Sequence, residues 1–277
     1  MRILLSSFFL IFLLPASFLF GQSYKELVEQ SAEFIENNQL DSAAASLQRA
    51  MSLEPTNESN PVLLLNLGIL QRQLRLFDDA YVSFTASMAN SPMPDLVLHN
   101  RASLLCDMER YDEAMEDYNL IIHRYPGDAE AYYRRGLLYL EQHDRTKAEA
   151  DFTMSEQIDP DNLYTKLSRA LRYKLDDNWV AAEKVYTDLI QSEQHVDPSF
   201  YLNRAECYVN TDQIFKASAD LRAIEDTQKN NPYFYFLRGR VRYEQFDKVA
   251  ASADFKKAKV LGYDGVFVDE WLKKTEK

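Results

Sequence analysis

The stretch that decides the fold is residues 129–162, which read AEAYYRRGLLYLEQHDRTKAEADFTMSEQIDPDN. Apolar residues recur at helical spacing early in this stretch and again in its second half, and polar residues separate the two stripes. Pro160 follows the second stripe, where its ring stops a helix. The stretch therefore predicts two α-helices joined as one hairpin.

The same pattern returns every 34 residues along the chain. Pro92, Pro126 and Pro160 are 34 residues apart, as are Pro198 and Pro232. Laid on this period, the chain gives seven units: 24–57, 61–94, 95–128, 129–162, 163–196, 198–231 and 232–265. Position 20 is alanine in every unit: Ala43, Ala80, Ala114, Ala148, Ala182, Ala217 and Ala251. Since alanine makes up only about a tenth of an ordinary chain, this agreement is not accidental.

Small residues at two positions of each unit predict closely packed helices. Position 8 is small in all seven units and includes Gly68, Gly136 and Gly239. Position 24 holds a large apolar residue, such as Phe152 in the fourth unit. Two helices approach to the short end of the 8–10 Å range only where the facing side chains are small. We therefore assign a structural role to these glycines and to the alanines at position 20.

Four units carry an arginine at position 7 and an aspartate 16 residues later, at position 23. The pairs are Arg101 with Asp117, Arg135 with Asp151, Arg204 with Asp220, and Arg238 with Asp254. The fifth unit breaks the rule, because Arg169 faces Val185 there. An arginine near a helix interface needs a carboxylate partner. We predict that each pair joins the two helices of its hairpin, with ligand binding by these arginines as the alternative.

This pattern resembles the tetratricopeptide repeat (TPR), a 34-residue helix–turn–helix unit. Residues 129–162 match it closely through Gly136, Ala148, Phe152 and Pro160, and depart from it at Arg135, where the family has leucine. The resemblance covers residues 24–265. It implies an all-α fold, a right-handed α-solenoid of about seven TPR helix hairpins.

Residues 266–277 follow the last unit and carry a further apolar stripe that includes Val268 and Trp271. The end of a solenoid exposes a core face that must be covered. We expect these residues to form a C-terminal capping helix. A role for Trp271 as an anchor for a partner is the alternative.

The resemblance also implies where a partner would bind. In this family the concave groove is formed mainly by first-helix positions 2, 5, 9, 12 and 13, and it usually binds an extended peptide or a partner helix. For some of these side chains, packing against the next repeat is the alternative. The candidate groove residues are Leu65, Leu96, His99, Asn100, Tyr133, Arg134, Leu137, Leu140, Leu167, Leu171, Tyr233, Phe236, Arg240 and Tyr243.

A second binding mode of the family, the carboxylate clamp for chaperone tails, is not expected in this chain. Asn100 and Arg134 fit the clamp, but Leu65, Ile69 and Glu130 occupy its other positions.

Composition excludes several other function classes. The 277 residues include only 7 glycines, which disfavours barrels, sandwiches and glycine-looped nucleotide folds. A net charge of −12 disfavours binding to nucleic acid. The four histidines, His99, His123, His143 and His195, lie in different units and lack the spacing of metal ligands. We therefore expect no enzymatic activity, no cofactor and no metal.

The N-terminus has the pattern of a secretory signal peptide over residues 1–22. Arg2 precedes an apolar stretch from Ile3 to Phe20, and the chain becomes polar at Gly21. We expect cleavage and a secreted or periplasmic protein that is not inserted in a membrane; an N-terminal membrane anchor is the alternative. Cys106 and Cys207 lie three units apart, too far for a disulfide in a stacked solenoid.

These observations predict a non-catalytic protein–protein interaction scaffold that binds a peptide or a segment of a partner protein in its groove. The alternative is a structural component of an envelope assembly, held through its convex or terminal faces or through self-association.

Overall fold

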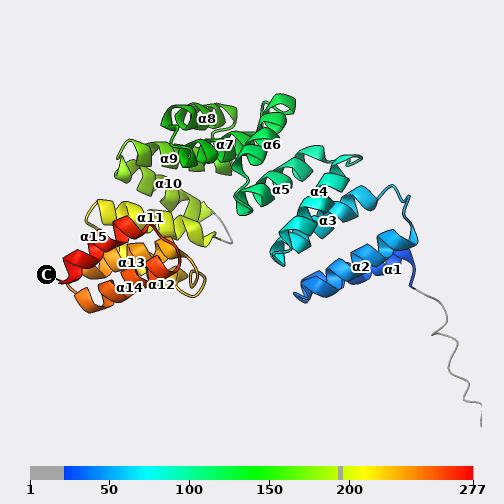
Figure 1. Ribbon diagram of the computed structural model, residues 1–277. Helices are drawn as coiled ribbons and strands as arrows, with labels where there is room; N and C mark the ends of the chain where they lie inside the picture. Colours follow the sequence, from blue (N-terminus) through cyan, green and yellow to red (C-terminus); the bar gives the residue numbers. More distant parts are fainter. Residues whose placement is uncertain (1–21, 193–195, 277) are drawn as a thin grey trace, which may run out of the picture. The chain divides into compact units, whose positions relative to one another are not determined.

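The computed structural model describes residues 22–192 and 196–276. Within them it contains fifteen α-helices and no strand, an all-α solenoid (Figure 1). Almost all of the expected signal peptide, and His195, lie outside the described residues. The helices are α1 (Tyr24–Glu36), α2 (Leu40–Leu53), α3 (Asn60–Gln73), α4 (Phe77–Met88), α5 (Pro94–Asp107), α6 (Tyr111–Arg124), α7 (Ala129–Glu141), α8 (Arg145–Ile158), α9 (Leu163–Leu175), α10 (Trp179–Ser192), α11 (Pro198–Asn210), α12 (Ile214–Ile224), α13 (Pro232–Glu244), α14 (Lys248–Val260) and α15 (Gly265–Glu276).

The chain divides into two compact units at Asp117, within α6. In the N-terminal unit α1 packs on α2 and α3 on α4. In the C-terminal unit the hairpins are α7–α8, α9–α10, α11–α12 and α13–α14, and the second helix of a hairpin packs on the first helix of the next. None of the described helices combines the length and the apolar composition that a membrane crossing needs.

Each hairpin turn contains one residue in the left-handed backbone region. These residues have φ between 54° and 66° and stand at position 15 of their units. A residue in this conformation ends the first helix and turns the chain toward the second one. The seven residues are Asn38, Arg75, Glu109, His143, Asp177, Asp212 and Phe246.

Side-chain caps begin several of the helices. Asp128 accepts a hydrogen bond from the backbone N–H of Ala131 at 2.8 Å, and Asp144 accepts one from Lys147 at 3.1 Å. Such caps satisfy N–H groups that have no partner inside the helix. The polar residues between the apolar stripes therefore determine where a helix starts.

The contact between the helices of a hairpin explains the small residues. All seven alanines at position 20 are fully buried. A Cβ atom added to Gly136 would lie 2.5 Å from Cε1 of Phe152, and Gly68 and Gly239 stand in the same relation to Phe84 and Phe255. Glycine occurs at position 8 only in the three units with phenylalanine at position 24. The ring occupies the space that a methyl group would need.

The C-terminal helix α15 covers the end of the last hairpin. Val268 is fully buried, and Trp271 contacts both Phe236 and Phe255, with ring centroids 6.3 Å and 5.7 Å away. The helix begins at Gly265, one residue before the expected cap. Its apolar side faces the core, as a cap requires.

Candidate functional site

Each of the four arginine–aspartate pairs forms a bidentate ion pair between the helices of one hairpin. Arg135 donates from Nε and Nη2 to the two carboxylate oxygens of Asp151, both at 2.7 Å. The Arg101, Arg204 and Arg238 pairs have the same geometry, at 2.6–2.9 Å. All four arginines thus pair with the expected aspartates, and a purely structural role for them stays a prediction.

The same arginines also reach the preceding hairpin through Nη1. Arg135 donates to Asn119 at 2.7 Å and Arg238 to Glu225 at 2.6 Å. In the fifth unit, which lacks the aspartate, Arg169 lies 3.8 Å from Glu156 of α8. These arginines therefore join successive hairpins as well as the two helices of one hairpin.

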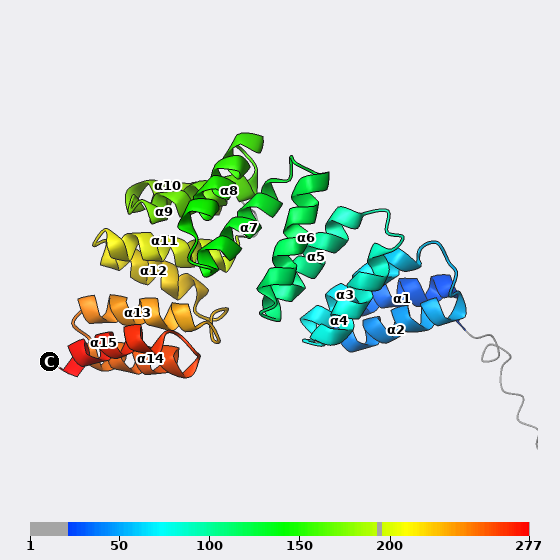
Figure 2. The same cartoon turned by 45° about the horizontal axis from the view of Figure 1, so that its top comes forward.

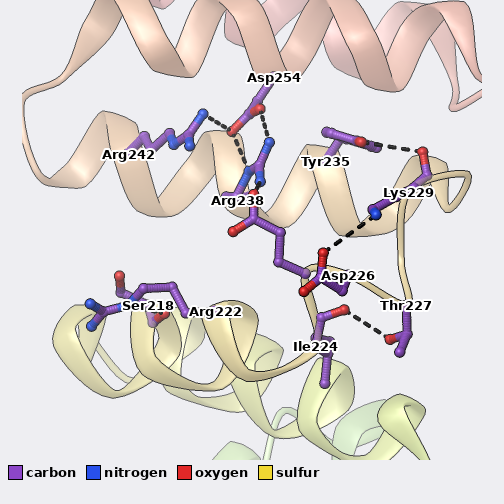
Figure 3. Close-up of polar contacts among 11 residues, drawn as sticks. Ser218, Arg222, Ile224, Asp226, Thr227, Lys229, Tyr235, Arg238, Arg242 and Asp254 are labelled. Carbon is purple, nitrogen blue, oxygen red and sulfur yellow. Dashed lines mark hydrogen bonds and ion pairs between the residues drawn. The ribbon is translucent and has the colours of Figure 1, made fainter.

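The last hairpin has a denser version of this arrangement (Figure 3). Asp254 accepts from Arg238 and, at 2.8 Å, from Nη1 of Arg242. Arg222 on α12 donates instead to the backbone carbonyl of Ser218, at 3.3 Å. A cavity of about 190 Å³ lies beside these groups. Arg238 therefore joins α13 to α14 through Asp254 and to the end of α12 through Glu225.

The candidate binding surface lies elsewhere in the C-terminal unit, on α7, α9, α11 and α13, and consists of their partly accessible side chains at positions 2, 5, 9 and 12 together with Arg134 at position 6; we call it the first-helix face. Its first part is aromatic. Tyr133 on α7 lies 5.7 Å from Tyr164 on α9, and the Arg134 guanidinium lies 5.6 Å from the Tyr164 ring and pairs with Glu130 at 2.5 Å. Burial raises the pKa of Tyr133 to about 12.

The second part of the first-helix face is charged. Lys174 on α9 forms an ion pair with Glu206 on α11, and its ammonium donates to Asn203 at 2.9 Å. The two charged side chains are only 16% and 17% exposed. Burial, and then the Glu206 carboxylate, raise the pKa of Tyr233 and of Tyr263. A carboxylate thus stands among tyrosines where little water reaches it.

Arg240 on α13 completes the first-helix face. Its guanidinium carbon lies 5.4 Å from the centre of the Trp271 ring, and its Nη2 lies 3.5 Å from Asn210. Its Nε is buried without a hydrogen-bond partner. A buried donor that lacks an acceptor costs about 1–3 kcal/mol, and more when it is charged. Among the described residues, the Arg240 guanidinium also has no carboxylate partner.

Two of the residues predicted to line the groove are buried instead. Leu65 and Phe236 are 2% and 3% exposed and lie in the core. Leu65 packs with Val97 of the next hairpin, and Phe236 is covered by Tyr263 and Trp271. Position 5 therefore packs against the following repeat at Leu65 and against the end of its own unit and the capping helix at Phe236.

The remaining candidates are partly accessible. In the C-terminal unit they share the first-helix face: Tyr133, Arg134, Leu137, Leu140, Leu167, Leu171, Tyr233, Arg240 and Tyr243. In the N-terminal unit Leu96 is exposed and His99 and Asn100 are half-buried; Asn100 lines a cleft of about 470 Å³ with Arg72 and Asp107.

Three residues of the first-helix face were missed: Tyr164, Lys174 and Glu206. They occupy positions 2, 12 and 9, so the positional rule itself could have found them. Among the described residues, no group of three or more histidine, cysteine, aspartate or glutamate side chains is arranged to hold a metal ion. Neither Cys106 nor Cys207 forms a disulfide.

Comparison with known proteins shows which family the chain resembles. Residues 99–162 match the tetratricopeptide repeat family model. A curated relative, the DnaJ homolog subfamily C member 7 homolog of Dictyostelium discoideum, is 25% identical over 138 residues, which are 45% of this chain and 26% of the relative. The matched region thus spans about a quarter of that protein's length.

Solved structures extend the comparison to nearly the whole chain. The Cut9–Hcn1 hetero-tetramer of APC/C (11% identity, 92% of this chain and 53% of that one, TM-score 0.69) shares the fold. So does PilW, a type IV pilus biogenesis factor (19% identity, 77% and 96%, TM-score 0.55). A tetratricopeptide repeat protein from Parabacteroides merdae is 33% identical, with 93% of this chain and 100% of that one covered and a TM-score of 0.67. On this similarity, together with its repeated hairpins, the chain belongs to the tetratricopeptide repeat family.

Proposed function

We propose that this protein is an interaction scaffold that binds a segment of a partner protein on the first-helix face of its C-terminal unit. The tetratricopeptide fold supports a general role in protein interaction, and members of the family typically act as non-catalytic scaffolds. The observation that carries the proposal is the Arg240 guanidinium, which lies over the Trp271 ring and has no carboxylate partner among the described residues.

The chemistry of the face indicates what the segment contains. An acidic side chain of the partner would pair with the Arg240 guanidinium, which has no carboxylate partner among the described residues. Apolar or aromatic side chains would pack beside Tyr133 and Tyr164, whose rings already lie 5.7 Å apart. Since helices hold these side chains in place before binding, little ordering cost opposes the interaction.

Selection from a random peptide library tests this proposal. Peptides that bind the full chain are expected to combine an acidic residue with apolar residues. Arg240→Met and Tyr133→Ala are each expected to weaken the selected peptides by tenfold or more. Arg222→Met is the matched control, because that arginine lies outside the first-helix face and its guanidinium donates to a backbone carbonyl of its own helix. Equal affinity in Arg240→Met and Arg222→Met would refute the proposal. Phe236→Ala is unsuitable as a test, because this residue belongs to the core.

We also propose that the protein is exported. The proposal rests on Arg2 and the apolar stretch from Ile3 to Phe20, which have the pattern of a cleaved signal. Mass spectrometry of the protein from its native cells is expected to find a mature N-terminus near Ser23. An N-terminus that retains the apolar stretch would favour the membrane-anchored alternative.

A further inference from the structure

Three consecutive hairpins of the C-terminal unit expose an apolar side chain at the same repeat position. Val180, Phe215 and Val249 all occupy position 18, at the start of α10, α12 and α14. They are 52%, 85% and 85% exposed. The first four units have polar residues at this position: Asp41, Asp78, Asp112 and Thr146. The apolar character is therefore confined to the last three hairpins.

Phe246 adds a fourth apolar side chain in the turn between α13 and α14. It stands at position 15, has a φ of 66° and is 90% exposed. A bulky residue seldom adopts this left-handed conformation. The other six hairpin turns have a polar or charged residue there. Neither the backbone conformation nor the packing of the fold accounts for phenylalanine at this place.

The turns that carry these four residues lie along one edge of the C-terminal unit. The turns that join α9 to α10, α11 to α12 and α13 to α14 follow one another on the left of Figure 2, and Figure 1 shows the same order. Helix α10 packs on α11, and α12 packs on α13. The helices that carry position 18 are thus linked through α11 and α13, and their equivalent positions follow one another along the stack, about two packing steps of 8–10 Å apart. We call Val180, Phe215, Phe246 and Val249 the turn row.

Acidic groups accompany the turn row. Asp177 and Asp212 are exposed in the first two of these turns, and neither carboxylate forms an ion pair within the described residues, although Arg145 lies near enough to Asp177 to interact with it electrostatically and exposed Lys216 adjoins Phe215. A second copy of this chain, at a net charge of −12, would bring the same acidic turns against them. An anionic membrane surface would be repelled in the same way. The charge pattern instead suits a basic partner.

We propose that the turn row binds an amphipathic segment of a partner protein. Apolar side chains of that segment cover Phe215 and Phe246, and its lysine or arginine side chains pair with Asp177 and Asp212. The turn row shares no residue with the first-helix face.

A defined peptide tests the proposal without knowledge of the natural partner. The probe is a fluorescent peptide of about 18 residues, long enough to form a helix on binding, with leucine on one face and lysine on the other. Fluorescence anisotropy measures its binding to the full chain. The Phe215→Ser/Phe246→Asn variant is expected to bind at least tenfold more weakly. Asp177→Asn/Asp212→Asn is expected to lower affinity at low salt more than at high salt.

Two controls separate this surface from general attraction to an acidic protein. Val82→Ser removes an exposed valine of the N-terminal unit and is expected to leave affinity unchanged. Arg240→Met, which disrupts the first-helix face, is also expected to leave it unchanged. Because Phe215 and Phe246 are exposed, their substitution does not disturb the core.

Three results would overturn the proposal. The first is equal affinity in Phe215→Ser/Phe246→Asn and wild type. The second is equal binding of a peptide with glutamate in place of lysine. The third is a wild-type dimer in sedimentation that this variant makes monomeric, which would assign the turn row to a second copy.

Discussion

Substitution of Gly136 by alanine tests the packing that underlies the repeat. Gly136 lies in α7 and faces the Phe152 ring on α8. The added Cβ would lie 2.5 Å from Cε1 and 2.9 Å from Cδ1 of that ring. Both distances are shorter than a carbon–carbon contact allows, so the ring or one of the helices must move.

Two opposing effects determine the size of the change. Overpacking of a well-packed core costs about 1–3 kcal/mol. Alanine inside a helix is more favourable than glycine by about 0.5–1 kcal/mol. We therefore expect Gly136→Ala to lower the free energy of unfolding by about 1–2 kcal/mol, which corresponds to a fall in Tm of roughly 2–8 °C.

Urea denaturation followed by circular dichroism measures this change, and hydrogen exchange in α7 and α8 locates it. Because repeat proteins can open locally, the loss of protection should be largest in these two helices. Gly127→Ala is the matched control, since a Cβ there meets nothing within 4 Å. The control is expected to be neutral or stabilised by less than about 1 kcal/mol.

A second substitution tests whether the Phe152 ring is the cause. The sixth unit pairs Ala205 at position 8 with Leu221 at position 24, so the chain itself contains the alanine–leucine combination. Gly136→Ala/Phe152→Leu is therefore expected to be more stable than the sum of the two single changes predicts, by about 1 kcal/mol. Additive effects, or a Gly136→Ala variant as stable as wild type, would refute the reasoning.

Three further measurements test the charged and buried groups. Asp151→Asn removes the carboxylate that holds Arg135 and is expected to cost about 3 kcal/mol in urea denaturation. Glu149→Gln, in an exposed ion pair, should cost less than about 1 kcal/mol, and equal costs would contradict the argument. Burial raises the pKa of Tyr133 to about 12, above about 10 for an unfolded chain, so its contribution to stability is complete below pH about 10 and is lost as pH rises through about 12. Tyr133→Phe should therefore reduce the loss of stability between these pH values, by up to about 3 kcal/mol; an unchanged alkaline decline would exclude this role. Burial also raises the pKa of Cys207 to about 12, so this thiol should react with Ellman's reagent at pH 8 only after unfolding, and rapid reaction in the folded protein would contradict its burial.

Much of the fold could be predicted from the sequence because the contacts within a hairpin are local and repeat with the chain. Gly136 and Phe152 are 16 residues apart, as are Arg135 and Asp151. Residues at such a fixed separation are brought together by one hairpin whatever the rest of the molecule does. The period, the alanines at position 20 and the four ion pairs therefore followed from the residue pattern.

The exposure of individual side chains depended on contacts between hairpins. Phe236 was expected on the binding surface but is covered by α15. Lys174 and Glu206 meet because α9 and α11 bring positions 12 and 9 of two successive units together. From residue type alone Phe215 and Phe246 would be assigned to the core, yet both side chains are exposed to solvent. The sequence by itself determined which residues pair inside each repeat, since that pairing is local. The tertiary structure decided which side chains a partner can reach, because packing of the neighbouring repeat buries some of them and leaves others exposed.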